Sequence, residues 1–290
     1  VAQVVSYALA VPIDQVRVSA TRTDKVPNTS ATAASSGADL NAMAALNAAN
    51  TLKHRLISFA ANHFRVDADS VRFAEATVFA GDHQLSFAEL VELAYLARVQ
   101  LSATGFYRTP KIHYNRKESR GRPFYYFAYG AAVSEVAIDT LTGENRVTAV
   151  DILHDAGKSL NPAVDLGQIE GGFIQGMGWL TTEELWWDED GKIRTHAPST
   201  YKIPTCSDRP TRMNIALWSA GENREPTIHR SKAVGEPPLM LAISVHQALS
   251  DAVSSISGYR FVPALDAPAT PEALLQAIGE ERKRASSSAP

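Results

Sequence analysis

Helical spacing of apolar residues, one every three or four positions, marks several parts of the chain. The opening predicts a helix with one apolar face, formed by Val4, Val5, Ala8 and Leu9. The same spacing predicts helices over residues 38–64, 86–99, 161–185, 237–256 and 270–278. Ser86 followed by Glu89 matches a capping box, and Thr270 before Pro271 matches a capped helix start. Asp39 is a candidate acid of the first turn of the second helix, or its cap.

Alternating apolar and polar positions predict strands elsewhere. Two alternating runs in residues 124–157 flank the turn sequence TLTGEN, and residues 71–87 are typical of a hairpin around Gly81–Asp82. Shorter runs predict strands in residues 14–20, 191–205 and 212–218. Strands and helices are mixed without strict alternation, which favours an α+β fold. We expect two mixed α/β lobes, followed by a C-terminal helix and a disordered tail, in residues 1–130, 131–262 and 263–290.

Composition is that of a globular protein, with 290 residues, 45% hydrophobic and 20% charged. A net charge of -3 gives no reason to expect nucleic acid or a membrane surface as partner, and no apolar run approaches bilayer length. The single cysteine, Cys206, excludes an internal disulfide or a cysteine-ligated metal cluster, and indicates a reducing, cytoplasmic compartment. Because Val1 falls within a helical pattern, we expect the chain to be part of a longer polypeptide, or a native subunit trimmed at its start.

Glu236 stands in an unusual place, between Gly235 and two prolines and directly before a long apolar helix. Pro237 disfavours the helical conformation at Glu236, so a stiff, extended turn is predicted. Two interpretations remain open on spacing alone. The carboxylate is a surface group that caps the helix, or it is a general base held in a cleft.

Two further segments combine small residues with helix starts. The sequence TSATAASSGADLN, residues 29–41, would leave backbone N–H groups free for a phosphate or another anion, or would pack closely against a neighbouring element. Glycines in residues 167–178 recur at one-turn spacing, which allows close approach of a helix or of a large flat ligand. Neither segment matches a P-loop or a dinucleotide fingerprint.

The sequence lacks the motifs of several other common catalytic sites. The eight histidines include no His-Glu-x-x-His pair, which argues against a zinc site. No Gly-x-Ser-x-Gly sequence is present, and Cys206 has no evident base beside it. Zinc hydrolysis and nucleophilic serine or cysteine catalysis are therefore not predicted.

Taken together, these segments resemble the C-terminal part of the molybdenum-cofactor subunit of the xanthine dehydrogenases, within the molybdenum hydroxylase family. The matching stretches are VPNTSATAASSGADLN, LSATGFYRTP, YFAYGAAVSEVAIDTLTGE, SLNPAVDLGQIEGGFIQGMGWLTTEEL, APSTYKIP and SKAVGEPPL. FYRTP and STYKIP favour the xanthine dehydrogenase branch. The resemblance implies that the two lobes belong to a molybdopterin-binding domain of a larger multi-domain enzyme.

The resemblance also implies roles for individual residues. Glu236 matches the family's catalytic glutamate, a general base in the hydroxylation of xanthine or hypoxanthine at an electron-poor ring carbon with water-derived oxygen. A partly desolvated pocket is expected to raise its pKa. The positions that match the cofactor cradle are Thr32, Ala33, Ala34, Ser35, Gly37, Gln168, Lys232, Val234 and Gly235. Molybdenum would be held through the pterin, near Ala34 and Glu236, without a direct protein ligand.

The same resemblance implies partners. Electrons would pass through 2Fe-2S clusters and FAD to NAD, all in other chains or domains of a purine-catabolising complex. We expect an upstream part of the molybdenum subunit, an iron–sulfur/FAD subunit and a purine substrate, in a dimer of heteromers. The family's purine-positioning residues lie upstream of Val1. Two alternatives therefore stay open: another molybdenum hydroxylase that oxidises aldehydes or N-heterocycles, and a non-catalytic scaffold of such a complex.

Overall fold

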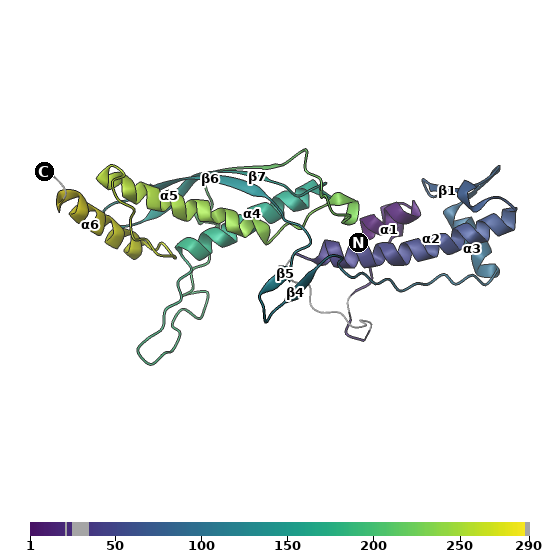
Figure 1. Cartoon of the computed structure of the whole chain (residues 1–290), viewed down its shortest axis with the longest axis horizontal. Helices are drawn as coiled ribbons and strands as arrows, with labels where there is room; N and C mark the ends of the chain where they lie inside the picture. The colour runs from purple at the N-terminus through teal and green to yellow at the C-terminus, as the bar shows by residue number, and fades with distance from the viewer. Residues whose placement is uncertain (21, 25–34, 288–290) are drawn as a thin grey trace. The chain divides into compact units, whose positions relative to one another are not determined.

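A computed structural model describes residues 1–20, 22–24 and 35–287 of the chain. Residue contacts divide it into two compact units, Val1–Tyr125 with Glu225–Ile228, and Tyr126–Arg224 with His229–Pro290. Both units mix helices with small sheets (Figure 1), which confirms the predicted α+β class. The division into three segments with boundaries at residues 130 and 262 stays a prediction.

The first unit is built on one long helix, α2. Its helices are α1 (Ala2–Leu9), η1 (Ile13–Gln15), η2 (Ala38–Ala42), α2 (Met43–Phe64), η3 (Ala68–Ser70) and α3 (Phe87–Leu96). Its strands are β1 (Val71–Ala74), β2 (Thr77–Ala80), β3 (His83–Ser86), β4 (His113–Asn115) and β5 (Arg120–Arg122). Leu56 of α2, Val78 of β2 and Leu90 of α3 are almost fully buried in one hydrophobic cluster. The core of this unit therefore lies between the C-terminal half of α2, the β1–β2–β3 sheet and α3.

The predicted hairpin and capping box in this unit are confirmed. β2 and β3 pair antiparallel around Gly81, whose φ of 59° is a conformation that favours glycine. The Ser86 hydroxyl accepts a hydrogen bond from the Glu89 N–H at 3.2 Å, and the Glu89 carboxylate accepts one from the Ser86 N–H at 2.7 Å. The backbone N–H groups of Ser86 and Glu89, at the start of α3, therefore both have a hydrogen-bond acceptor.

Two expectations for the first unit are wrong. Residues 16–20 form no strand, because the β-branched residues there have no neighbouring strand to pair with in the part of the chain that the structure describes. Asp39 is an acid of the first helical turn, which confirms one of its two predicted places, but it is not the cap, because the π-helical turn η2 that leads into α2 begins at Ala38. Helical backbone begins before Asp39, so the residue is inside the turn.

The second unit is a three-stranded sheet covered by helices on one face. Its strands are β6 (Gly130–Ile138), β7 (Asn145–His154) and β8 (Arg212–Leu217), and β7 pairs antiparallel with β6 and parallel with β8. Its helices are α4 (Pro162–Thr181), η4 (Cys206–Asp208), η5 (Ile228–Arg230, which begins in the first unit), η6 (Pro237–Ala242), α5 (Ile243–Ser254), η7 (Ser255–Ser257) and α6 (Pro271–Ser287). The inward side chains of the sheet pack with α4, α5 and α6, and the residues at the centre of this core include Val150, Ile169, Phe173, Leu249 and Ile278.

The predicted β6–β7 hairpin and the predicted strand at 212–218 are confirmed, but three expectations for this unit are wrong. Residues 191–205 form a loop that extends from the end of α4 (Figure 1), with only an isolated bridge between Trp187 and Ile193. Without a partner strand, the alternating pattern there does not produce a sheet. α6 continues through Ser287, so the chain is helical well beyond residue 278.

The third correction concerns the apolar helix after Glu236. Residues Pro237–Ser257 are long and apolar enough to cross a membrane by length and composition, contrary to the expectation from the sequence. Core helices pass the same test, and this one buries Val245, Leu249 and Val253 in the hydrophobic cluster of the second unit. The burial of this face accounts for its apolar character.

The glycine face of α4 is used in two different ways. A side chain at Gly172 would meet the Gly235 carbonyl oxygen at 2.5 Å, and one at Gly176 would meet the Leu239 carbonyl oxygen at 2.3 Å. Among the described residues, nothing lies within 4 Å of a side chain added at Gly167 or Gly171. Close helix packing therefore explains two of these glycines, and the other two leave bare backbone on an open surface.

We expect Gly176→Ala to destabilise the protein by about 1–3 kcal/mol, because its methyl group would overlap the backbone of η6. Gly279→Ala in α6 is the matched control, since nothing lies within 4 Å of the added methyl group. Alanine there should stabilise the helix by about 0.5–1 kcal/mol. Chemical denaturation of the two variants measures both changes, and equal free energies of unfolding would contradict the packing argument.

Candidate functional site

The segment Ser231–Glu236 runs along the second unit and is held by its backbone. Ser231 forms an isolated antiparallel bridge with Gly157, and the Lys232 N–H donates to the Ala156 carbonyl oxygen at 2.9 Å. The Ala233 N–H donates to the Tyr126 hydroxyl at 2.8 Å. Three successive residues of this segment are therefore tied to the chain around them before it reaches Glu236.

Gly235 changes the direction of the backbone. Its φ is 130°, which L side chains rarely adopt, and its carbonyl oxygen lies against Gly172 of α4. Both the conformation and the close approach require glycine at these two positions. The turn that presents Glu236 thus depends on a pair of glycines, one on each side of the contact.

Glu236 follows in a conformation that the sequence did not predict. Its φ of -73° and ψ of -44° are helical, although a following proline disfavours that region. The Leu239 N–H donates to the Glu236 carbonyl oxygen at 3.0 Å, which closes the first turn of η6 and offsets this preference. The side chain is exposed and makes no cap hydrogen bond to η6, so the expectation of a helix cap is wrong. The chain by itself does not desolvate this carboxylate.

Gln168 lies one turn before Gly172 on α4, between the two open glycines. Its side chain is exposed, and the neighbouring positions Gly167 and Gly171 carry no side chain that would cover it. An amide that both donates and accepts, beside bare helix backbone, suits a flat polar group such as a pterin. These residues of the second unit therefore fit the cofactor that the resemblance implies.

Lys232 points into the second unit. Its ammonium nitrogen lies 2.5 Å from Asp155 Oδ2 and 4.9 Å from the centre of the Tyr129 ring, and only 6% of its side chain is exposed. Val234 packs against the hydrophobic core of the same unit. The side chains of these two predicted cradle residues thus make contacts within the protein.

His154 precedes Asp155 at the end of β7 and is almost fully buried. Burial lowers the pKa of His154, while the nearby Asp155 carboxylate opposes that shift. Its Nδ1 atom has no hydrogen-bond partner in the part of the chain that the structure describes. The imidazole is therefore neutral at neutral pH, and Asp155 is left to pair with Lys232.

The predicted site residues of the first unit are only partly described. Thr32, Ala33 and Ala34 lie outside the described residues, whereas Ser35 and Gly37 immediately precede η2. Ser35 has a φ of 54°, an uncommon conformation for a residue other than glycine. A cavity of about 150 Å³ begins beside them, and its lining residues are Ser36, Asp39, Leu40, Met43, Tyr107, Thr109, Tyr125 and Thr227.

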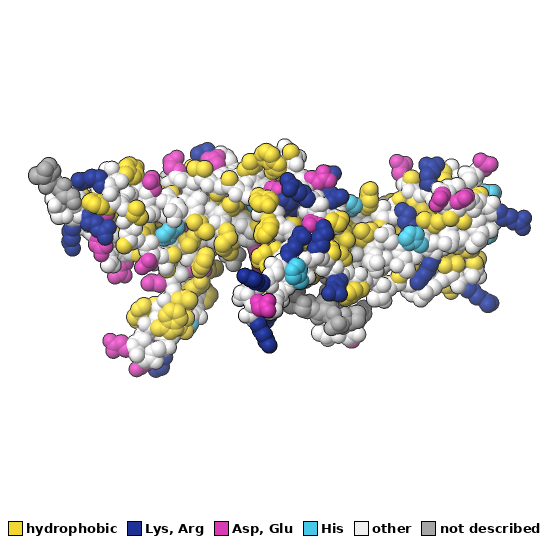
Figure 2. All heavy atoms as spheres, in the orientation of Figure 1, with side chains coloured by type: hydrophobic (Ala, Val, Ile, Leu, Met, Phe, Trp, Pro, Cys, Tyr) yellow, Lys and Arg dark blue, Asp and Glu magenta, His cyan; other side chains and the backbone are white. Residues whose placement is uncertain are grey.

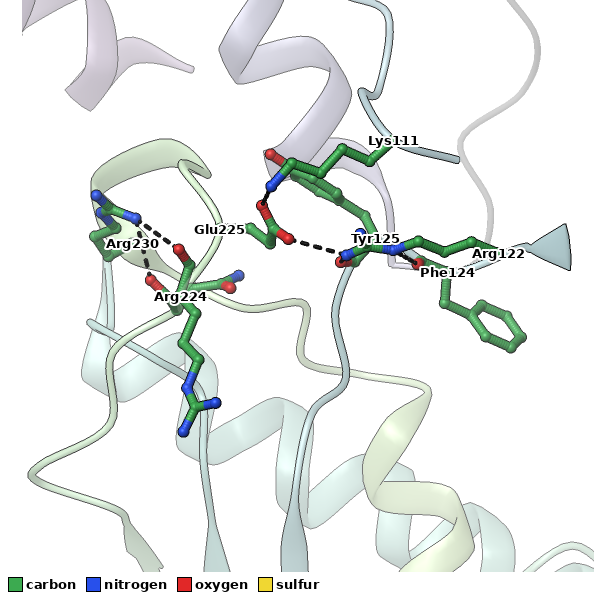
Figure 3. A network of polar contacts seen from close by, with 8 residues as sticks. Lys111, Arg122, Phe124, Tyr125, Arg224, Glu225 and Arg230 are labelled. Carbon is green, nitrogen blue, oxygen red and sulfur yellow. Dashed lines mark hydrogen bonds and ion pairs between the residues drawn. The ribbon is translucent and has the colours of Figure 1, made fainter. Parts of the chain in front are cut away.

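Glu225, in the same unit, is an acidic residue with two cationic partners. Glu225 accepts from Lys111 Nζ at 2.7 Å and from the Arg122 guanidinium at 2.9 Å (Figure 3). The hydrogen bond from Lys111, with that from Arg122, keeps the pKa of Glu225 below its usual range. Burial raises the pKa of the adjacent Tyr125 to about 12, and Tyr107 and Glu225 add to this shift.

The residues before Glu225 and after Ile228 belong to the second unit and form a separate set of contacts. The Arg230 guanidinium donates to the Arg224 carbonyl oxygen at 3.0 Å (Figure 3). It also donates to the Asn223 carbonyl oxygen at 3.4 Å. The Asn223 amide group in turn donates to the Ser231 carbonyl oxygen at 3.0 Å. This chain of contacts leads directly into the segment that ends at Glu236.

Sequence reasoning did not identify Asp155, Tyr126 or Asn223 as part of this site. The partners of Asp155 and Tyr126 lie 77 and 107 positions away in the sequence, so residue spacing does not reveal these contacts. Asn223 contacts Arg230 and Ser231 within the same loop, but it matches no motif. One signal was available for Asp155, which follows a buried strand and precedes Gly157. Polar residues at such strand ends are often functional.

Comparison with known proteins identifies the family. The family model of the molybdopterin cofactor-binding domain matches residues 1–210. The chain belongs to the molybdopterin cofactor-binding domain family. Thr32–Gly37 and Gln168 fall within the matched residues, and Lys232–Glu236 follow them.

Curated relatives extend the similarity to most of the chain. It is 43% identical to xanthine dehydrogenase from Oryza sativa subsp. japonica over 288 residues, which are 96% of this chain and 20% of that protein. It is 43% identical to xanthine dehydrogenase/oxidase from Gallus gallus over 278 residues, 95% of this chain and 19% of that protein. This chain thus spans about a fifth of the length of these oxidoreductases.

Solved structures agree on the fold. Quinoline 2-oxidoreductase from Pseudomonas putida 86 superposes with a TM-score of 0.82 at 26% identity, covering 96% of this chain and 34% of that one. The Cu,Mo-CO dehydrogenase superposes with a TM-score of 0.76 at 20% identity, over 97% of this chain and 34% of that one. The resemblance to molybdenum hydroxylases that the sequence motifs indicated is therefore confirmed.

We expect Glu225→Gln to lower Tm at about pH 7, with the difference from wild type shrinking as the pH falls below about 4.5. A carboxylate with a depressed pKa stabilises the folded state above its unfolded pKa of about 4.5, and this stabilisation is lost as the pH falls through the folded pKa. Thermal melts across this range measure the effect. Glu222→Gln is the control, because Glu222 is half exposed and its cationic partners lie 3.6 and 3.8 Å away. An equal response of both variants would contradict the role of Lys111 and Arg122.

Proposed function

We propose that this chain forms part of the molybdenum-cofactor site of a xanthine dehydrogenase-like enzyme, with Glu236 as its general base. The observation that carries the proposal is the identity of about 40% to xanthine dehydrogenases along almost the whole chain. Exposure of Glu236 supports it, because a general base must reach a reacting group. The substrate would be xanthine or hypoxanthine, and the oxygen added to the ring would come from water.

Each proposed residue has a distinct task. Gln168 would hydrogen-bond the pterin from the open face of α4, and Gly235 would let the backbone pass close to it. Residues 32–37 of the first unit would contact the cofactor, and Lys232 and Val234 would support the turn that presents Glu236 in the second unit. When bound, the molybdenum cofactor would supply the redox chemistry, and Glu236 would accept a proton.

The remaining parts of the enzyme belong to the proposal as well. Residues that position the purine would come from an upstream part of the molybdenum subunit. Electrons would leave through 2Fe-2S clusters and FAD to NAD in an iron–sulfur/FAD subunit, within a cytoplasmic dimer of heteromers in purine catabolism. Relatives about five times as long as this chain support the need for such partners.

A second candidate function rests on the solved structures. Quinoline 2-oxidoreductase has the same fold at 26% identity, so a hydroxylase of another N-heterocycle would use the same chain architecture. Anaerobic assays of the whole enzyme with xanthine, hypoxanthine and quinoline separate the two. Reduction of the enzyme by xanthine or hypoxanthine but not by quinoline supports the first function. Reduction of the enzyme by quinoline but not by the purines supports the second.

We expect Glu236→Gln and Glu236→Ala to reduce kcat per molybdenum by about 10²–10⁴-fold, because the general base is lost. Molybdenum content and assembly should stay at wild-type levels, since an exposed side chain supports neither. Elemental analysis and steady-state turnover of the purified enzyme measure these quantities. Turnover at the wild-type level in both variants would exclude Glu236 as the base and favour a scaffold.

We expect Gln168→Ala to change the retention of molybdenum and not the turnover, the reverse of the Glu236 variants. Loss of the hydrogen bonds to the pterin should speed the release of molybdenum by about two- to tenfold, while turnover per bound molybdenum stays near wild type. Dialysis followed by elemental analysis records the release. Glu170→Ala is the control, since Glu170 is exposed on another face of α4. Equal retention in the two variants would remove Gln168 from the cradle.

A further inference from the structure

Asp155 makes two contacts with its two carboxylate oxygens. Oδ2 lies 2.5 Å from the Lys232 ammonium nitrogen, and Oδ1 accepts a hydrogen bond from the Gly157 N–H at 2.8 Å. Its side chain is 17% exposed and that of Lys232 is 6% exposed. One buried carboxylate thus links the loop after β7 to the segment that ends at Glu236.

The backbone on both sides of this ion pair is closely packed. The Lys158 N–H donates to the Arg230 carbonyl oxygen at 3.1 Å, and the Lys232 N–H donates to the Ala156 carbonyl oxygen at 2.9 Å. A side chain at Gly157 would meet the Arg230 carbonyl oxygen at 2.4 Å, and its φ is 62°. The loop at 155–158 must keep its shape for these contacts to form, and the Asp155 carboxylate holds that shape.

The charge of Lys232 is satisfied inside the second unit. The Asp155 carboxylate and the Tyr129 ring face its ammonium group, and little of the side chain reaches solvent. Removal of the carboxylate would leave a buried cation without its counter-charge. This destabilises the folded state more than removal of both charged groups does. The lysine would then have to move toward water, and its backbone would move with it.

Movement at Lys232 reaches Glu236 through a short, constrained path. Between them, Ala233 is held by the Tyr126 hydroxyl, Val234 by the hydrophobic core and Gly235 by Gly172. A stiff path of this kind transmits a displacement, because no residue in it is free to absorb one.

We propose that Asp155 is a positioning residue, which acts through Lys232 to fix the place of Glu236. This inference rests on the proposed function, and it assigns Lys232 to the support of the turn. A misplacement of about 1 Å in a catalytic group lowers turnover by about 10²-fold, so the ion pair would matter for rate well before it mattered for folding.

The test compares two aspartates of the same strand region in the whole, cofactor-loaded enzyme. Asp155→Asn removes the charge and keeps an oxygen that can accept from Gly157. Asp151→Asn is the matched control, because Asp151 pairs with Arg212 at 3.3 Å on the surface, where both side chains are at least half exposed. Exposed ion pairs of this kind contribute little to the stability of the folded state.

We expect Asp155→Asn to lower kcat by about 10–100-fold with KM changed less than about twofold, because the base shifts and substrate contacts do not. Molybdenum content should equal that of wild type. Hydrogen exchange should accelerate in peptides covering residues 232–239 and stay unchanged in α2. Asp151→Asn should match wild type in all four measurements.

A double variant distinguishes the buried charge from general damage. D155N/K232Q leaves no unpaired ammonium group, so its exchange over residues 232–239 should be slower than that of D155N. If D155N does not accumulate, K232Q is assayed in the same way, and the same loss of kcat is expected.

Either of two results would overturn the inference. Asp155→Asn, or K232Q in its place, could behave as Asp151→Asn does. Alternatively, turnover could fall only in proportion to molybdenum, which would make the pair a cofactor-holding device. Glu236→Gln, measured in parallel, separates this failure from that of the proposed function: full activity in Glu236→Gln removes the base itself, whatever Asp155 does.

Discussion

The second unit depends on the close approach of η6 to α4. Gly172 and Gly176 remove the side chains that would keep the two backbones apart, so the carbonyl oxygens of Gly235 and Leu239 lie directly against the helix. That contact sets where η6 begins and therefore where Glu236 stands. Because α5 directly follows η6, the same contact also sets the position of α5, whose Val245 and Leu249 are buried in the core. One packing requirement thus determines both the position of the candidate base and the burial of the apolar helix behind it.

Periodicity predicted the elements whose partners are close in sequence. The hairpins at Gly81 and at 139–144 and the capping box at Ser86 were found in this way, because each is complete within a few residues. The strands expected in residues 14–20 and 191–205 failed for the converse reason, since a strand needs a neighbour that local pattern does not supply. The long helices were predicted correctly, and the end of α2 at Phe64 matches the prediction, whereas α6 continues to Ser287, beyond its predicted end.

The candidate site was predictable in its chemistry and unpredictable in its support. Motifs pointed to Glu236, Gln168 and the glycines, because these residue types stand out in sequence. They did not point to Asp155 or Tyr126, whose contacts join residues 77 and 107 positions apart. They also misjudged the backbone at Glu236, because the preference imposed by Pro237 was outweighed by the hydrogen bond from Leu239. Local rules describe what each residue favours, and tertiary contacts decide which preference prevails.

The distribution of tryptophan gives the chain a built-in optical label. All four tryptophans lie in the second unit, and each is about half exposed, namely Trp179 (52%), Trp186 (53%), Trp187 (52%) and Trp218 (50%). Two of them stand on the loop that follows α4, where Figure 2 shows hydrophobic side chains along the surface. Indole emission shifts to shorter wavelength when water is excluded from the ring. Tryptophan fluorescence, excited selectively, therefore reports on the second unit alone, and a blue shift on mixing with a partner would show that this surface has been covered.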